Sequence, residues 1–357
     1  MKSLKKQFLN IFLVVILALI AFILVKSSND ELNFQSIENF FRACNLWYIG
    51  IAVVCMLMFV FFEAFSIHII LKRFGHKPKF YESLAYSTSD VYYSGITPSA
   101  TGGQPASAFY MIRDGVPGGT ACFGLVFNLI GYTAALVLIG AVVMALNIPL
   151  FMSFSIPVQI LIGGGLLVQI FLFIFFFICI CRHGIVLKVG LFFINLLCRV
   201  RIIKKRIKWL KKLVKTVNKY SSCYQSFSSQ KSLFVSVLVC NVIQRAAIIG
   251  VSVFVCASAT DCSLSLLFAM QTFVMLGYNS IPLPGGTGAF EYLYMNVYDK
   301  AFGTEFIVVA MMVTRTISYY ASMVISGIYT LVYHVAHPES KKVRAKKKDK
   351  KISETSA

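Results

Sequence analysis

The stretch GYNSIPLPGGTGAFEYLYMNVY, residues 277–298, interrupts a sequence that is otherwise built of long apolar runs. It brings prolines, glycines, a carboxylate (Glu291) and four tyrosines into a region where a membrane helix normally carries Leu and Ile. Backbone at membrane depth must satisfy its own polar groups, so irregular structure persists there only where protein buries it or where it lines a wet cavity. The stretch therefore predicts a broken, re-entrant hairpin that forms part of a transport site for a polar lipid.

The composition around this stretch is that of a membrane protein. Of 357 residues, 58% are hydrophobic and 13% are charged, whereas soluble domains have about 45–50% and about 25%. The net charge of +20 gathers near the N-terminus and in residues 72–79, 182–219 and 341–351. Because these clusters flank apolar runs, the positive-inside rule explains them better than nucleic-acid binding does. We therefore expect a polytopic membrane protein that binds no nucleic acid by itself.

Six apolar runs are long enough to cross a bilayer, which takes about 17–25 residues. They are residues 8–25, 47–71, 120–146, 157–181, 232–256 and 306–335. The basic start and the Lys-rich tail place both termini in the cytoplasm. The expected fold class is an all-α polytopic membrane protein, with an integral membrane domain over residues 1–335 and a disordered basic tail over residues 336–357.

Two further segments are too polar for ordinary spans. Residues 80–114 have the basic residues Lys79 and Arg113 at their two ends, which predicts entry and exit on the cytoplasmic side. With both termini inside, the number of crossings is even, so residues 264–300 must enter and leave on the outside. Paired Gly/Pro-interrupted segments of this kind are the best sequence indication of a transporter site at the midplane. The alternative is a pair of helix kinks that serve packing only.

The hairpins are rich in glycine, which allows backbone to approach a ligand closely. A half-helix that starts inside the membrane also points N–H groups and a partial positive charge at an anion. A phosphodiester headgroup suits such a pocket. The hairpin residues expected to bind it are Gly102, Gly103, Gln104, Gly285, Gly286, Gly288 and Glu291.

Ionisable side chains inside membrane spans are rare, usually face the interior and often pair with one another. Those in the membrane segments here include Glu63, Asp90, Arg245, Glu291 and Arg315. Arg suits phosphate because its planar fork donates two bonds and stays charged. We expect Arg245 and Arg315 to hold lipid phosphate, or to hold Glu291 and Asp90 between transport events, with Tyr319 on the same helix face as Arg315. Glu63 and Asp90 are the expected charge partners, and the alternative is an ion pair that only fixes helix packing.

The basic segment 182–230 contains apolar residues at helical spacing between lysines. It predicts either an amphipathic helix on the anionic cytoplasmic leaflet or a solvated loop. The ten cysteines lie mostly in apolar runs without CxxC or His clusters, which indicates buried thiols rather than disulfides or a metal site. No Walker loop, zincin helix or nucleophile elbow occurs. We expect no catalytic residue, no metal and no cofactor.

The segments ITPSATGGQPASAFYMIRDGV, PLPGGTGAFE and TRTISYYASMVISG resemble the lysylphosphatidylglycerol synthase transmembrane (flippase-like) family, over nearly the whole chain to about residue 333. In two-part members, this membrane domain flips aminoacylated phosphatidylglycerol and a cytosolic domain transfers lysine from lysyl-tRNA. The chain resembles the membrane part alone. Relatives have an Arg soon after the first glycine pair and an acidic-Arg pair on the next helix, where this chain has Ser107 and Asn128. This difference bears on headgroup recognition.

The resemblance and the hairpins together predict a lipid translocase of the bacterial cytoplasmic membrane, with an anionic phospholipid as its partner. The first alternative is the membrane half of a phosphatidylglycerol lysyltransferase, which acts in lipid modification and cationic peptide resistance with a separate lysyl-tRNA-dependent transferase. The second is a non-transporting scaffold for envelope-lipid synthesis. By itself the chain is expected not to be an enzyme, because the aminoacyl-transferase portion is absent from it.

Overall fold

A computed structural model describes residues 34–97, 100–181, 231–281, 283–299 and 304–337, together with residues 187, 188, 191, 192, 195, 210, 214 and 302. The predicted span at residues 8–25 lies outside the described residues. So do nearly all of the basic segment 182–230 and the tail beyond residue 337. Every regular element in the described part of the chain is helical, which confirms the all-α fold class.

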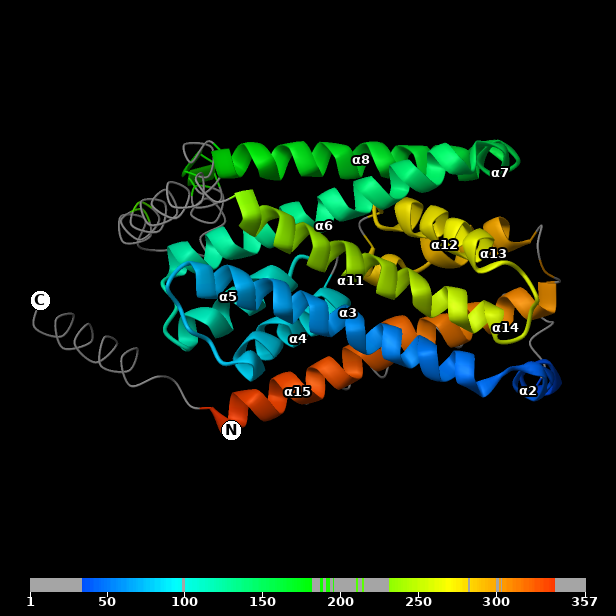
Figure 1. The fold of residues 1–357 in the computed structure, drawn as a ribbon, viewed down its shortest axis with the longest axis horizontal. Helices are drawn as coiled ribbons and strands as arrows, with labels where there is room; N and C mark the ends of the chain where they lie inside the picture. The colour runs from blue at the N-terminus through cyan, green and yellow to red at the C-terminus, as the bar shows by residue number, and fades with distance from the viewer. Residues whose placement is uncertain are drawn as a thin grey trace, which may run out of the picture.

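Among the described residues, five helices are long and apolar enough to cross a membrane, each where the sequence predicts a span. They are α3 (Leu46–Arg73), α6 (Gly118–Leu146), α8 (Ile156–Cys181), α11 (Lys231–Ala257) and a last helix made of α14 (Thr304–Arg315), the π-helical turn η3 (Thr316–Ala321) and α15 (Ser322–Ala336). Two short helices, α2 (Phe34–Ala43) and α7 (Ile148–Met152), lie at one end of the bundle (Figure 1). The chain is a multi-pass membrane protein.

The two polar segments form helical hairpins that turn back inside the bundle. The first consists of α4 (Phe80–Ile96) and α5 (Gly103–Arg113). The second consists of α12 (Leu264–Tyr278), a short turn at Pro284–Gly286 and α13 (Ala289–Tyr298). Helices of 17 and 15 residues rise only about 22–26 Å, which is less than the hydrocarbon thickness of about 30 Å. The first hairpin enters from the end at which α3 terminates, and the second enters from the α2 end (Figure 1).

The tyrosines of the second hairpin are core residues with satisfied hydroxyl groups. Tyr294 and Tyr298 are fully buried and their rings stack 4.3 Å apart. The hydroxyl group of Ser252 on α11 lies 3.2 Å from each of their hydroxyl oxygens, and the thiol of Cys256 lies 3.1 Å from that of Tyr294. Buried tyrosine hydroxyls need such partners. The polar atoms of α11 therefore explain why this hairpin carries Tyr where Leu would be expected.

The glycine run 163–165 on α8 allows one close helix contact. A Cβ at Gly165 would collide with the backbone carbonyl of Leu276 on α12, and the hydroxyl of Ser280 donates to the carbonyl of Gly165 at 3.2 Å. A Cβ at Gly163 or Gly164 would meet nothing within 4 Å. Only the third glycine is required by packing.

We expect Gly165→Ala to destabilise the protein by about 1–3 kcal/mol, because the opposing backbone cannot move aside cheaply. Gly164→Ala is the matched control and should be neutral or stabilising by up to about 1 kcal/mol, since Ala is the better helix former. The apparent thermal unfolding midpoint in detergent measures both. Equal midpoints for the two variants would contradict the contact.

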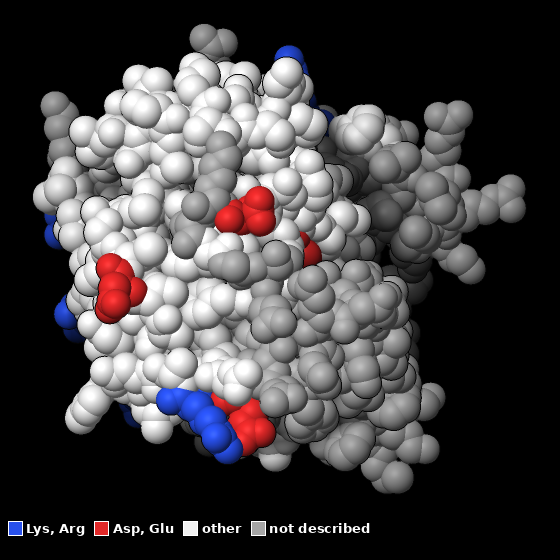
Figure 2. All heavy atoms as spheres, turned by 90° about the vertical axis from the view of Figure 1, so that its right-hand side faces the viewer, with Lys and Arg blue, Asp and Glu red and all other residues white. Residues whose placement is uncertain are grey.

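Charged side chains differ between the two ends of the bundle. At the end where α3 terminates, the described chain has Lys72, Arg73, Lys79 and Arg113. At the opposite end, acidic side chains stand out on the surface (Figure 2), and the described residues there include Glu38, Asp261 and Asp299. The first hairpin thus enters from the basic end and the second from the end that carries the acidic residues.

Candidate functional site

The tips of the two hairpins meet in the middle of the bundle, on either side of Tyr319. The hydroxyl of Tyr319 donates to the carbonyl of Gly95, near the end of α4, at 2.8 Å. The other face of its ring lies against Gly285, where an added Cβ would collide with the ring. Gly285 has φ +58°, in the left-handed region that favours glycine. Tyr319 therefore joins the two tips through one hydrogen bond and one close contact.

Tyr319 lies in the π-helical turn Thr316–Ala321, which separates α14 from α15. Such turns are rare and occur frequently at functional sites. The extra residue in this turn changes the direction of the side chains that follow Arg315. The spacing of Arg315 and Tyr319 predicts that they share one face of a regular helix, and in the structure they are close, with the Arg315 guanidinium 5.4 Å from the Tyr319 ring centroid. The π-helical turn itself was not predicted.

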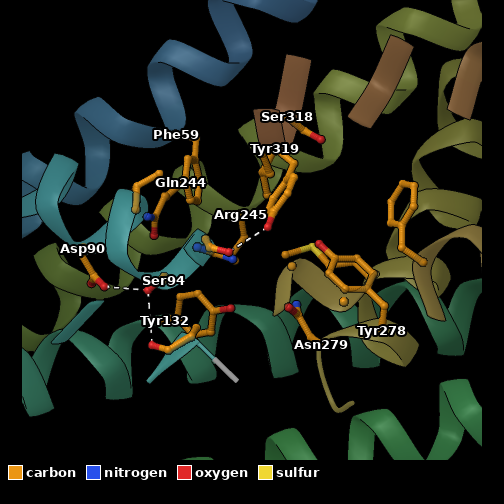
Figure 3. Close-up of a pocket in the computed structure, with 18 of the residues that line it drawn as sticks. Phe59, Asp90, Ser94, Tyr132, Gln244, Arg245, Tyr278, Asn279, Ser318 and Tyr319 are labelled. Atoms are coloured by element: carbon orange, nitrogen blue, oxygen red, sulfur yellow. Dashed lines mark hydrogen bonds between the residues drawn. The ribbon is translucent and has the colours of Figure 1, made fainter. Parts of the chain in front are cut away.

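A cavity of about 590 Å³ surrounds this junction (Figure 3). Helices α3, α4, α6, α8, α11 and α12 contribute to its wall, together with both hairpin tips and the last helix. Three of its lining residues, Ala100, Val168 and Leu283, are exposed, so the cavity reaches the surface beside the tips and beside α8. The expected site residues that line it are Glu63, Asp90, Gln104, Arg245, Gly285, Gly286, Arg315 and Tyr319.

Arg315 is held by the second hairpin and keeps one free donor group. Its Nε donates to Glu291 Oε1 at 3.0 Å, and its Nη1 donates to the carbonyl of Gly285 at 2.8 Å. Its guanidinium lies 4.0 Å from the ring centroid of Phe290. The side chain is buried, and its Nη2 has no hydrogen-bond partner. The ion pair with Glu291 is one of the two roles predicted for Arg315.

Glu291 and Gly288 build the tip and do not line the cavity. The second oxygen of the Glu291 carboxylate accepts the backbone N–H of Gly288 at 2.5 Å, at the start of α13. One carboxylate thus caps the half-helix and fixes Arg315. The N-terminus of α13 was expected to face a bound anion. In the structure its N–H at Gly288 is already used by Glu291.

Arg245 is stacked between aromatic rings instead of being paired with Asp90. Its guanidinium lies 3.8 Å from the ring centroid of Tyr132 on α6 and 5.2 Å from that of Phe59 on α3. It is buried, its Nε has no hydrogen-bond partner, and it forms no ion pair within the part of the chain that the structure describes. Cation–π contacts of this kind hold a buried guanidinium without neutralising it. Of the two roles predicted for Arg245, an ion pair with Glu291 or Asp90 is therefore not observed among the described residues.

The first hairpin holds Asp90 through neutral groups. Asp90 accepts the Ser94 hydroxyl at 3.0 Å and the Gln104 Nε2 at 2.5 Å. A Cβ at Gly103 would collide with Asp90, so the glycine lets α5 start directly against this carboxylate. The N–H of Gly102 donates to the Thr97 hydroxyl at 2.8 Å. Gly102 and Gly103 shape the tip without lining the cavity.

The structure gives different surroundings to Ser107 and Asn128. Ser107 is fully buried on α5, and its Oγ has no hydrogen-bond partner. Asn128 on α6 lines the cavity and joins three helices: its Oδ1 accepts Ser66 Oγ of α3 at 2.6 Å and Asn241 Nδ2 of α11 at 3.2 Å. Amide and hydroxyl groups thus occupy the region of the wall around Asn128.

Several polar wall residues were not predicted from the sequence. They include Tyr132, Gln244, Gln271, Tyr278 and Asn279. The signal that could have found them is a polar side chain inside an apolar run, such as Gln244 beside Arg245 on α11. No group of three or more His, Cys, Asp or Glu side chains able to hold a metal occurs among the residues that the structure describes.

Comparison with known protein families identifies one match. The family model described as "Lysylphosphatidylglycerol synthase TM region" matches residues 9–326. This range includes both hairpins, the predicted first span and the basic segment. No curated protein matches the chain.

Proposed function

This chain belongs to the lysylphosphatidylglycerol synthase transmembrane family, and on that premise we propose that it is a translocase that moves an anionic phospholipid headgroup between the two leaflets. The family supports a role connected with membrane lipids. The translocase activity and the choice of phosphatidylglycerol-type or aminoacylated phospholipids are our proposal, and the geometry of the cavity supports them.

The single observation that carries the proposal is a pair of buried arginines with unused N–H groups in one cavity. Arg245 Nε and Arg315 Nη2 have no hydrogen-bond partner, and both residues line the space between the hairpin tips. A buried donor without a partner costs about 1–3 kcal/mol or more when charged. A phosphodiester supplies both the acceptor oxygens and the compensating charge, and arginine binds it in a fixed geometry.

The size and position of the cavity also suit a headgroup. Its volume of about 590 Å³ lies within the range of about 300–1,000 Å³ that is typical of small-ligand sites. The acyl chains can stay in the bilayer where the cavity reaches the surface near Ala100 and Leu283. Because the hairpins enter from opposite ends, movement of one tip opens the cavity to one side and movement of the other opens it to the opposite side.

The orientation that we propose follows the charges of the described residues. The end with Lys72, Arg73, Lys79 and Arg113 faces the cytoplasm of a bacterium, in agreement with the positive-inside rule. Both termini are then cytoplasmic, and the second hairpin opens outward. A separate lysyl-tRNA-dependent transferase would supply an aminoacylated lipid at the cytoplasmic side.

Reconstitution in liposomes tests the proposal. Fluorescent phosphatidylglycerol on the inner leaflet should become accessible to dithionite at least tenfold faster with the protein than in protein-free vesicles. Lysyl-phosphatidylglycerol and a polyprenyl phosphate serve as further anionic or aminoacylated probes, and phosphatidylcholine serves as the neutral control. No acceleration for any of the three probes would overturn the translocase assignment.

A second candidate function is suggested by the word "synthase" in the family description. As the membrane half of a phosphatidylglycerol lysyltransferase, the protein would present phosphatidylglycerol to the transferase. Purified protein incubated with lysyl-tRNA and phosphatidylglycerol vesicles tests whether this chain transfers lysine without a partner. We expect no lysyl-lipid from this chain alone, and its formation would favour the enzyme.

A further inference from the structure

A pair of carboxyl groups in the cavity has no role in the proposal so far. Glu63 on α3 and Asp90 on α4 are 7% and 6% exposed, and both line the cavity. Neither forms an ion pair within the described residues. This pair is buried, faces the ligand space and is not neutralised by a bound cationic side chain.

The direct partners of the pair are neutral and leave acceptor oxygens unused. Gln244 Nε2 donates to Glu63 Oε2 at 3.3 Å, and Gln104 and Ser94 donate to Asp90. Gln244 is 2% exposed, and its Oε1 has no hydrogen-bond partner. The Oε1 of Gln104 also has no hydrogen-bond partner. Both glutamines line the cavity. Two carboxyl groups and two unused amide oxygens form an oxygen-rich environment that suits a small cation, not an anion.

The charged groups around the pair lie on one side of it. Arg245 on α11 follows directly after Gln244, which donates to Glu63, and Figure 3 shows Asp90 and Gln244 on one side of Arg245 and Tyr278 on the other. The other titratable groups of the wall belong to the remaining elements. They are Tyr132 of α6, Tyr278 of α12, Arg315 of α14 with its partner Glu291 of α13, and Tyr319 of the π-helical turn. The wall therefore has a carboxylate side and an arginine side.

We propose that Glu63 and Asp90 form a coupling-cation site that takes up one proton or one sodium ion when an anionic headgroup occupies the arginine side. The inference rests on the proposed function. The positive charge of Arg245 stabilises the ionised, cation-free form of the carboxyl pair. A phosphodiester beside Arg245 offsets that positive charge and adds a negative charge close to the pair. The pair then binds a cation more tightly, and by reciprocity the cation strengthens binding of the anion.

Binding of the coupling cation would also reduce the net charge that crosses the membrane. An anionic headgroup and one cation move together as a neutral pair, whereas an uncompensated charge at membrane depth is costly. The expected coupling is a change of about 5- to 150-fold in headgroup affinity. Lipid translocation would then be driven by a proton or sodium gradient in the direction of cation entry.

The test is headgroup binding by the full-length protein in nanodiscs, with dihexanoyl-phosphatidylglycerol as the probe. In sodium-free buffer, the Kd should rise at least fivefold between pH 6 and pH 8 if the cation is a proton. A pH-indicator dye in weak buffer should then report proton uptake on binding. If the cation is sodium, replacing choline with sodium at pH 8 should lower the Kd at least fivefold without proton uptake.

The double variant Glu63→Gln with Asp90→Asn keeps the shape of both side chains, removes both acidic groups and replaces one acceptor oxygen of each with an NH2 donor. It should bind the probe with a Kd that depends on neither pH nor sodium. Glu38→Gln on the exposed helix α2 is the control and should behave like the unaltered protein. The unfolding midpoint of each variant in detergent separates loss of the cation site from loss of fold.

The outcomes distinguish the inference from the proposed function. Probe binding that depends on neither pH nor sodium in the unaltered protein would overturn the coupling-cation site while leaving the translocase proposal intact. The same cation dependence in the double variant would also overturn the site. No binding of the probe under any condition, together with no lipid translocation in vesicles, would overturn both.

Discussion

Replacing Arg315 with glutamine should lower the rate of phosphatidylglycerol translocation at least a hundredfold. The substitution removes the unpartnered Nη2 of this cavity-lining residue and the charge that attracts a phosphodiester. It also breaks the ion pair with Glu291 and the hydrogen bond to the carbonyl of Gly285. Hydrogen bonds that involve charged groups contribute about 1.5–3 kcal/mol each, so loss of the phosphate contacts together with disorder of the tip accounts for the expected fall.

The measurement is the dithionite assay in liposomes, combined with the Kd for dihexanoyl-phosphatidylglycerol. Glu291→Gln is the informative companion. Its amide oxygen can still accept the N–H of Gly288, but the charge that orients Arg315 is lost. If Arg315 binds phosphate, Glu291→Gln should retain most of the probe affinity while Arg315→Gln loses it. Arg42→Gln, in an exposed pair on α2, is the charge control and should have no effect.

Equal loss of probe affinity in Arg315→Gln and Glu291→Gln would assign Arg315 only a structural role in the second hairpin. An unchanged translocation rate in Arg315→Gln would contradict the proposal that Arg315 belongs to the translocation site. That result is the one expected of a non-transporting scaffold. Comparing Arg315→Gln with Glu291→Gln therefore separates a ligand-binding arginine from an ion pair that only fixes the packing of helices.

Replacing Gly285 with alanine should reduce translocation at least tenfold and lower the unfolding midpoint by several degrees. An alanine at φ +58° costs about 1–2 kcal/mol in the backbone. The new methyl group would also push the Tyr319 ring away from the second hairpin. Displacement of the ring breaks its hydrogen bond to the carbonyl of Gly95, which contributes about 0.5–1.5 kcal/mol. The two hairpin tips would then lose their connection.

Gly288→Ala is the matched control for this variant. Gly288 also has positive φ, +86°, but an added Cβ there meets nothing within 4 Å. It should therefore show the backbone cost without the collision, and its translocation should fall less than that of Gly285→Ala. Tyr319→Phe tests the hydrogen bond alone, because it keeps the ring and removes the hydroxyl group. Identical defects in Gly285→Ala and Gly288→Ala would show that the contact between Gly285 and Tyr319 has no role.

The sequence was most informative where charged residues, prolines and glycines occur inside membrane segments. Prolines and glycines in residues 277–298 predicted the second hairpin because no other structure satisfies a broken backbone at membrane depth. The same reasoning named Arg315 as a partner of Glu291, and the structure confirms that ion pair at 3.0 Å. The basic residues at the ends of residues 80–114 predicted a hairpin that enters from the opposite end. These predictions need only local composition and the period of the apolar runs.

The interior of the site was less predictable. Arg245 was expected to hold lipid phosphate or a carboxylate, and in the structure its guanidinium lies against the Tyr132 ring. Gly102, Gly103 and Gly288 were predicted to bind the headgroup; they lie at the tips and do not line the cavity. No spacing along the chain indicates which face of one membrane helix meets which face of another when nearly every face is apolar.

The sequence by itself determined the family, the all-α membrane fold, five of the spans that the structure describes, and the two hairpins with their charged residues. A charged side chain or a broken backbone is costly in lipid, so such features are rare in membrane segments. Where they occur, the amino-acid composition alone indicates them. Only the tertiary structure decided that Tyr319 joins the two tips, that Glu63 and Asp90 line one cavity, and that two arginines in this cavity keep N–H groups without a partner. These features depend on contacts between residues far apart in the chain, which arise only when helices of similar composition pack in one particular order.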